Sequence, residues 1–253
     1  MKHHEPPLKK QMNMLMITSL PIKKQIILMK KILLYSILAI STCSPAFAQK
    51  DTQAKAILNQ VSQKYKSYDA IKTDFSFTLD NPQAGVKETQ NGTLISKAKS
   101  GKYRVTLYAS AGGKDVDKEI INDGKTQWTY LKKDKEVQVG DAPKGTDGVS
   151  NPSQIFTIYE HGYKYLYTGE QKIGGKAYQV IDLTPENEKQ NIFKVRLLID
   201  KAKKQIYSAQ LFDKNGNKYN YTVRSFTPNA QIADATFAWD AKGHPGVELV
   251  DLR

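Results

Sequence analysis

The chain has 253 residues, of which 38 are Lys or Arg, 25 are Asp or Glu and one is Cys. This length allows one large domain or two small ones. A single cysteine excludes a disulfide framework within the chain, and the formal charge of +13 makes the protein basic.

The N-terminal region has the three parts of a secretory signal peptide. Met29-Lys30-Lys31 is a short basic start, residues 32–42 form an apolar run, and Ala46-Phe47-Ala48 is a small-x-small cleavage site. The apolar run is too short for a membrane span, which needs about 20 residues. We therefore predict an N-terminal extension plus signal peptide at 1–48, with the signal peptide at about 29–48. Cleavage after Ala48 leaves one exported domain at 49–253.

Two alternatives concern this region. Residues 1–28 precede a complete signal peptide, and they are either an overlong start with Met29 as the true first residue, or an unusually long basic segment. Ile40-Ser41-Thr42-Cys43 loosely resembles a lipoprotein box, in which the cysteine carries lipid. Thr42 fits that box poorly, so we expect a cleaved protein without cysteine.

The charge of the predicted mature domain is smaller than that of the whole chain. Residues 49–253 carry 31 basic and 24 acidic side chains, a formal +7. The lysines are spread along the chain, which favours a solvated surface. The alternative is weak attraction to an anionic membrane or an acidic partner. Nucleic acid is not an expected partner of an exported protein.

A helix is predicted first and strands follow it. Between residues 52 and 70, apolar residues recur at spacings of three and four, which is typical of an amphipathic helix. From Thr73 the period changes to two, as in Phe75, Phe77 and Leu79, and later in Tyr103, Val105 and Leu107. Asp123-Gly124 predicts a hairpin turn before the strand that contains Trp128 and Tyr130.

A loop and a second set of strands complete the domain. Residues 140–151 are rich in Gly, Asp and Asn, and Asn151-Pro152 suits the start of a short helix that contains Ile155, Phe156 and Tyr159. Further strands are predicted at 163–169, 177–183, 193–200, 206–212 and 218–226, with candidate final strands at 237–239 and 247–252. Short connections between about 11 strands predict an antiparallel meander.

Catalytic and metal-binding patterns are missing from residues 49–253. His161 and His244 have no partner at ligand spacing, and no nucleophile elbow, phosphate loop or aspartate-rich calcium loop occurs. We therefore expect no enzyme activity, no metal and no cofactor.

A sheet of this size must curl, close or split. A wide barrel covered by helices would enclose a lumen lined by Phe75, Phe77, Tyr103, Val105, Trp128, Tyr130, Val195 and Leu197. The alternative, favoured by the pattern alone, is that these residues pack an ordinary core. The assignment of the inward face depends on strand register, because a slip of one residue reverses it.

The order of several motifs resembles the LolA family of periplasmic lipoprotein carriers. The resemblance covers nearly all of 49–253 and is most specific in Asp123-Gly124-Lys125-Thr126-Gln127-Trp128-Thr129-Tyr130, a structural hairpin. The other matching segments are 57–68, 71–79, 92–94, 102–104, 151–159, 180–185, 195–200, 213–217, Phe237 and 245–251.

The resemblance implies a mainly β fold with a helical lid, an unclosed antiparallel barrel over a hydrophobic cavity. It implies a monomeric carrier that takes lipoprotein acyl chains from an inner-membrane ABC transporter to an outer-membrane acceptor or to the outer membrane itself. A paralogous carrier or sensor for another lipid, or an interaction module with a filled core, remains open. The cavity lining expected from pattern and resemblance together adds Leu79, Leu94, Leu107, Ile155, Phe156 and Tyr159 to the eight residues above.

One departure from the family concerns the lid. Family members commonly carry an arginine just before the Tyr103 region, and it holds the lid closed. This sequence has Lys97-Ala98-Lys99-Ser100-Gly101 there. Arg104 is close, but strand alternation predicts that it points to the side opposite Tyr103. The lid contact is therefore expected to involve a lysine, to lie elsewhere or to be missing.

Overall fold

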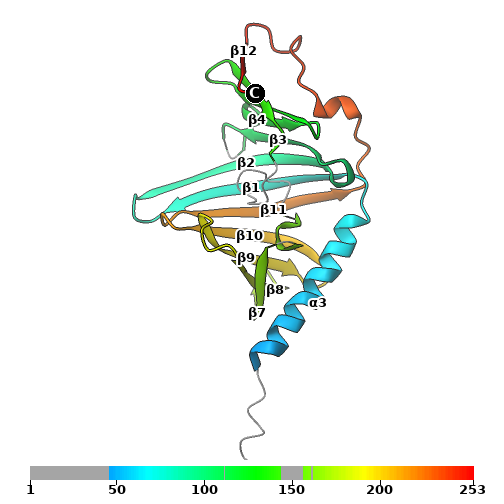
Figure 1. Cartoon of the computed structure of the whole chain (residues 1–253), viewed down its shortest axis with the longest axis vertical. Helices are drawn as coiled ribbons and strands as arrows, with labels where there is room; N and C mark the ends of the chain where they lie inside the picture. Colours follow the sequence, from blue (N-terminus) through cyan, green and yellow to red (C-terminus); the bar gives the residue numbers. More distant parts are fainter. Residues whose placement is uncertain (1–45, 111, 144–155, 161) are drawn as a thin grey trace, which may run out of the picture. The chain divides into compact units, whose positions relative to one another are not determined.

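The computed structural model describes residues 46–110, 112–143, 156–160 and 162–253. The predicted signal peptide and Cys43 lie almost wholly outside these residues, as does the part of the predicted short helix before Phe156. Its described part, residues 156–160, contains the 3-10 turn η3 rather than an α-helix. Phe47–Arg253 form one compact unit (Figure 1). In the described part of the chain this unit contains one α-helix and twelve strands.

The single helix and the first strands come first in the chain. They are α3 (Ala46–Lys66), β1 (Ile71–Asn81), β2 (Val86–Lys97), β3 (Lys102–Tyr108), β4 (Val116–Asn122), β5 (Thr126–Leu131) and β6 (Glu136–Asp141). The later strands are β7 (Tyr163–Ile173), β8 (Lys176–Pro185), β9 (Ile192–Asp200), β10 (Gln205–Asp213), β11 (Lys218–Pro228) and β12 (Glu248–Asp251). Three short 3-10 turns lie between them: η1 (Ala98–Ser100), η3 (Ile158–Glu160) and η4 (Asp234–Phe237).

All twelve strands belong to one sheet, in the order β12-β6-β5-β4-β3-β2-β1-β11-β10-β9-β8-β7. The two edge strands, β12 and β7, do not pair with each other, so the sheet is not closed. The predicted unclosed antiparallel sheet is confirmed, with one strand more than expected. The exception to the antiparallel pattern is β12, which runs parallel to β6.

Helix α3 follows from the apolar spacing in its sequence. Its side chains that face the sheet are almost fully buried, because Ala54, Ile57, Leu58, Val61 and Tyr65 are each at most 5% exposed. The helix ends four residues before the predicted limit of residue 70. The amide of Tyr68 bonds the carbonyl of Tyr65 in a tighter final turn, and the chain then enters β1.

Two expectations for the C-terminal end have different outcomes. The predicted strand at 247–252 is confirmed as β12. The predicted strand at 237–239 is wrong, because residues up to Phe237 form the 3-10 turn η4. The reason is tertiary: Phe237 is buried and the carbonyl of Thr236 accepts a hydrogen bond from Arg104, so this segment packs on the sheet rather than joining it.

The sheet has two distinct faces, which we name by what packs on them. The inner face is the one that packs against α3, and it carries the main hydrophobic core, including Phe75, Val105 and Leu197. The outer face is the opposite one. Directly paired residues of neighbouring strands share a face, so the registers assign every paired residue to one of the two.

Candidate functional site

An apolar cavity lies in the inner-face core. It is lined by Thr73, Phe75, Leu94, Phe156, Ile206, Ala209, Tyr221 and Val223, which come from β1, β2, β10, β11 and the segment before η3. The cavity volume is about 20 Å³, which is room for roughly one water molecule. This conformation is therefore closed, and a larger apolar ligand requires the side chains or the cover to move.

The cover of the cavity is made by α3 and the segment around η3. The ring of Phe156 stacks on Tyr65 of α3, with ring centroids 4.8 Å apart, and both rings contact Phe226 of β11. Glu160 accepts a hydrogen bond from Ser62 and forms an ion pair with Lys66 at 3.0 Å. Two elements far apart in sequence are thus fastened together over the cavity. We call α3 with residues 156–160 the lid.

Within the described residues, the polar contacts of the lid include those of Ser62, Lys64 and Lys66 of α3. Lys64 donates to the carbonyl of Lys203 in the turn before β10, so α3 is also joined to the sheet. The lid also makes aromatic contacts through Tyr65 and Phe156. Burial raises the pKa of Tyr65 and of Tyr159, so both hydroxyls stay protonated across the physiological range. No charge therefore develops between the lid and the sheet at these two positions.

The floor of the cavity depends on a glycine. Gly92 of β2 pairs with Phe75 on one side and with Leu107 on the other. A Cβ atom at Gly92 would lie 2.6 Å from the tip of the Phe75 ring and 2.8 Å from the carbonyl oxygen of Thr106. Because Gly92 has no side chain, the Phe75 ring can pack directly over the backbone of β2.

A row of aromatic rings leads from the cavity along β1 and β11. Phe75 lies 6.1 Å from Tyr221, and Phe77 lies 4.9 Å from Tyr221 and 6.4 Å from Tyr219, between ring centroids. Phe77 and both tyrosines are only partly buried. The apolar surface therefore continues past the closed cavity along β1 and β11.

Most of the predicted lining residues lie on the inner face. Phe75, Leu94 and Phe156 line the cavity. Tyr103, Val105, Tyr159, Val195 and Leu197 are buried in the same core, and Phe77 and Leu107 pack against it while partly exposed. Leu79 is half-buried further along β1, opposite Tyr219, and Ile155 lies outside the described residues.

Trp128 and Tyr130 do not join this group. In the register, Val105 is opposite Ile120, which in turn is opposite Thr129, so Thr129 is the inner-face residue of β5. Its neighbours Trp128 and Tyr130 therefore point to the outer face. Tyr130 contacts Trp239 and His244 there, with centroids 5.2 and 4.9 Å away. The expectation that these two residues share a face with Val105 is corrected by the register.

Five cavity residues were missed by sequence reasoning: Thr73, Ile206, Ala209, Tyr221 and Val223. The alternation of Tyr219, Tyr221 and Val223 was available as a signal for β11. In β10 the signal is broken, because a bulge between Ile206 and Ser208 changes the alternation, so that Ile206 and Ala209 share the inner face at a spacing of three.

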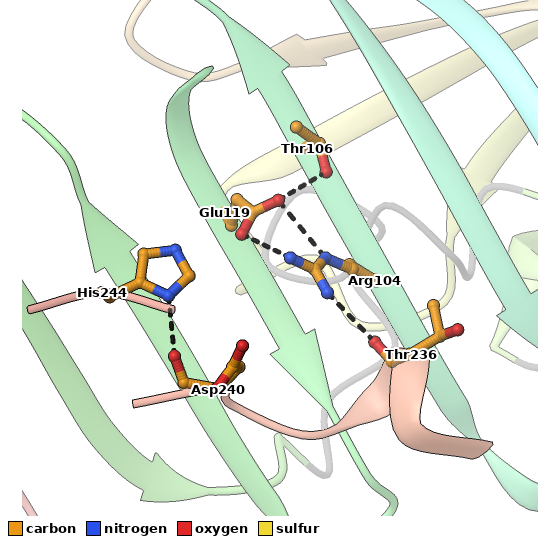
Figure 2. A network of polar contacts seen from close by, with 6 residues as sticks. All are labelled: Arg104, Thr106, Glu119, Thr236, Asp240 and His244. Carbon is orange, nitrogen blue, oxygen red and sulfur yellow. Dashed lines mark hydrogen bonds and ion pairs between the residues drawn. The ribbon is translucent and has the colours of Figure 1, made fainter. Parts of the chain in front are cut away.

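The outer face carries a polar network centred on Glu119 (Figure 2). Arg104 donates to both carboxylate oxygens of Glu119, at 3.2 and 2.7 Å, and Thr106 donates to Oε1 at 3.0 Å. A further nitrogen of Arg104 donates to the carbonyl of Thr236 at 3.4 Å. The prediction that Arg104 points away from Tyr103 is confirmed. Arg104 fastens the C-terminal segment to the outer face and does not touch the lid.

An open groove of about 890 Å³ lies beside this network on the outer face. Its walls include Lys72, Asp74, Arg104, Glu119 and Arg224. Burial acts to raise the pKa of Asp74, but hydrogen bonds from Ser225 and Thr93 outweigh it and hold the pKa below its usual value. A groove lined by ionised side chains does not suit a hydrocarbon chain.

Two further observations concern the described residues only. They contain no group of three or more His, Cys, Asp or Glu side chains placed to hold a metal ion. Within the same ranges, no helix combines the length and the apolar character that a membrane crossing requires.

Residues 66–240 match the family model described as outer membrane lipoprotein carrier protein LolA. The chain belongs to the LolA family. The matched range begins at the end of α3 and includes β1 to β11, η4 and Trp239, so it contains every residue that lines the cavity. The fold is thus that of a family of lipoprotein carriers.

Several solved structures are similar to this LolA family chain. An uncharacterized conserved protein from Thermus thermophilus has a TM-score of 0.49 and 13% identity, over 79% of this chain and 99% of that chain. A LolA superfamily protein from Nitrosomonas europaea has a TM-score of 0.42 and 14% identity, over 74% and 98%. The lipoprotein LppX from Mycobacterium tuberculosis has a TM-score of 0.44 and 10% identity, over 72% and 98%. No curated protein sequence matches the chain.

Proposed function

We propose that this LolA family protein is a periplasmic chaperone that binds the acyl chains of lipoproteins and carries them from the inner to the outer membrane. The observation that carries the proposal is the apolar cavity under a fastened lid, in a chain whose family is that of lipoprotein carriers. Its role is to bind and release cargo, and no catalytic step is proposed. Its partners are an inner-membrane ABC transporter that releases lipoproteins and an acceptor at the outer membrane.

The physical need for such a carrier follows from the hydrophobic effect. Each methylene group of an acyl chain left in water costs about 0.8 kcal/mol. A lipoprotein with several chains therefore faces a barrier of tens of kcal/mol in an aqueous compartment, by the same rule. An apolar cavity removes that barrier while the cargo crosses.

The closed cavity must open before it can accept an acyl chain. Because about 20 Å³ cannot hold an acyl chain, side chains or the cover must move when cargo enters, and we propose that the lid moves away from the inner face. The contacts between α3 and residues 156–160 join the two parts of the lid to each other, so these parts can move as one body. Closure on release returns apolar surface of the cavity to protein contact, which favours discharge of the cargo.

A second candidate keeps the fold and changes the cargo. The half-buried aromatic row of Phe77, Tyr219 and Tyr221 would equally suit another lipid or apolar molecule. Depletion of the protein in the cell separates the two candidates. Lipoprotein transport predicts that outer-membrane lipoproteins accumulate in the inner membrane, and normal sorting in depleted cells would exclude it.

The cavity itself is tested by a matched pair of substitutions on β10. Ala209→Phe fills the cavity, because Ala209 is fully buried and lines it. Gln210→Phe adds the same ring to the outer face one residue later. We expect Ala209→Phe to weaken binding of a fluorescent fatty acid at least ten-fold at a stability cost of about 1–3 kcal/mol, and Gln210→Phe to leave binding unchanged.

The measurements are fluorescence titration and native mass spectrometry of co-purified lipid, with circular dichroism to confirm folding. A folded Ala209→Phe variant that still binds the probe like the unmodified protein would remove this cavity from the binding site.

A further inference from the structure

A buried threonine hydroxyl lies at the apolar cavity. Thr73 of β1 is 1% exposed and lines the cavity. Its hydroxyl oxygen has no hydrogen-bond partner anywhere in the described part of the chain. Its two directly paired neighbours on the inner face are Leu94 of β2 and Phe226 of β11, both apolar. The hydroxyl is therefore surrounded by hydrocarbon and aromatic groups.

Such a group is unfavourable for the protein without ligand. A buried hydroxyl that makes no hydrogen bond loses its hydration and gains nothing in return. Valine has nearly the same shape, is a better strand former and would have no such cost. A trapped water is a poor partner as well, because a stable buried water needs two to four polar contacts, and apart from the tyrosine ring the other lining side chains are apolar. The position thus favours a ligand that brings its own acceptor.

We propose that the Thr73 hydroxyl donates a hydrogen bond to the carbonyl oxygen of an acyl group bound in the cavity. This inference rests on the proposed function and specifies its ligand class, a fatty acyl ester or amide rather than a plain hydrocarbon. The acyl carbonyl is a strong acceptor attached directly to a saturated chain. The Thr73 donor would fix how far the chain enters, with its methylene groups against Phe75, Ile206 and Val223.

The test compares three ligands of similar length on the purified full-length protein: methyl myristate, N-methyl myristamide and pentadecane. Each displaces a fluorescent apolar probe, and the two carbonyl ligands distinguish an ester source from an amide source. We expect at least one carbonyl ligand to bind about five-fold more tightly than pentadecane, which is the value of one neutral hydrogen bond.

The variants are Thr73→Val, Thr73→Ser and the control Thr78→Val, whose hydroxyl lies near that of Thr89 away from the cavity. Thr73→Val should abolish the preference for carbonyl ligands and leave pentadecane binding unchanged. It should also raise the melting temperature of the lipid-free protein by about 3 °C, because an unpaired hydroxyl is removed. Thr73→Ser and Thr78→Val should keep the preference.

The possible failures are distinguishable. If the unmodified protein binds all three ligands equally, or if Thr73→Val keeps the carbonyl preference, the role of Thr73 is wrong and the proposed carrier function stands. If the unmodified protein binds none of the three ligands, the carrier function and the role of Thr73 are both wrong.

Discussion

Two regions of the same sheet differ in which face carries most of the buried apolar side chains. In β1 and β7–β11 most of them point to the inner face, where α3 and Phe156 cover them, although Tyr178 and Val180 of β8 are buried on the outer face. In β4–β6 the outer face is also buried: Ile121, Val137 and Val139 are at most 4% exposed, and Tyr130 packs against Trp239 and His244 of the C-terminal segment. The apolar residues of a strand therefore predict that one of its faces is buried, but they do not predict which element packs against that face.

We therefore expect the inner face to bind cargo and the outer face to contribute mainly to stability. The lid side holds the cavity and must open for cargo to enter. The outer side is fastened by the Arg104–Glu119 pair, by ion pairs from Lys97 and Lys102 to Asp234, and by the contact of Lys97 with the ring of Phe237. We expect the outer side to remain closed while the lid moves, so that substitutions in the two regions have separable effects on stability and on binding.

The largest expected effect is on stability, from Phe237→Ala. Phe237 is 1% exposed on the outer side, and removal of a buried phenylalanine costs about 3–5 kcal/mol. Urea unfolding measures this loss, and the tryptophan emission, to which Trp239 contributes, should shift to the red as the C-terminal segment loosens. Lipid binding should be retained, because the cavity is on the other face.

Phe193→Ala serves as the control for this substitution, since Phe193 is 47% exposed and its removal should change stability by less than about 0.5 kcal/mol. Loss of lipid binding by a folded Phe237→Ala protein would show that the two faces are coupled.

A pair of charged substitutions tests the two faces directly. Phe77→Glu places a carboxylate in the aromatic row of the inner face, and Trp128→Glu places one on the outer face. We expect Phe77→Glu to weaken fatty-acid binding about ten-fold, because a charge beside the acyl chain must be desolvated, and Trp128→Glu to leave binding unchanged. Fluorescence titration of both folded variants measures this, and equal losses would contradict the assignment of faces.

The smallest expected effect is a pH dependence from the outer face of β8 and β9. Arg196 donates to both carboxylate oxygens of Asp182, at 2.7 and 2.8 Å. Burial acts to raise the pKa of Asp182, but the hydrogen bonds and charge of Arg196 outweigh it, so the pKa lies below its usual value. A lowered pKa stabilises the folded state above about pH 4, and this contribution is lost as the pH falls through the folded value.

Asp182→Asn should therefore reduce stability at pH 7 by at most about 1 kcal/mol, because Arg196 is partly exposed to solvent. The gap to the unmodified protein should narrow as the pH falls below about 4. Urea unfolding at several pH values measures it, and a gap that stays constant with pH would disprove the role of the pair. Lipid binding should not change in this variant.

The strand positions were largely predictable, and the assignment of faces was not. Alternation placed Phe75 and Val105 correctly because their strands have one apolar and one polar face. The same alternation in β5 identified Trp128 and Tyr130 as apolar positions but put them on the wrong face. Their face follows from the register across the 109–115 loop and from a bulge at Leu107 and Tyr108, neither of which is visible in local spacing.

The sequence by itself determined the helix followed by strands, the hairpin at Asp123-Gly124 and, through the order of its motifs, the LolA family. These features depend on residues close together in the chain. Only the tertiary structure decided that the sheet has two covered faces, that β12 pairs parallel with β6, and that Thr73, Ile206 and Ala209 meet Phe156 around one cavity. Those outcomes depend on contacts between residues far apart in the chain, such as Tyr65 with Phe156, and local periodicity contains no information about them.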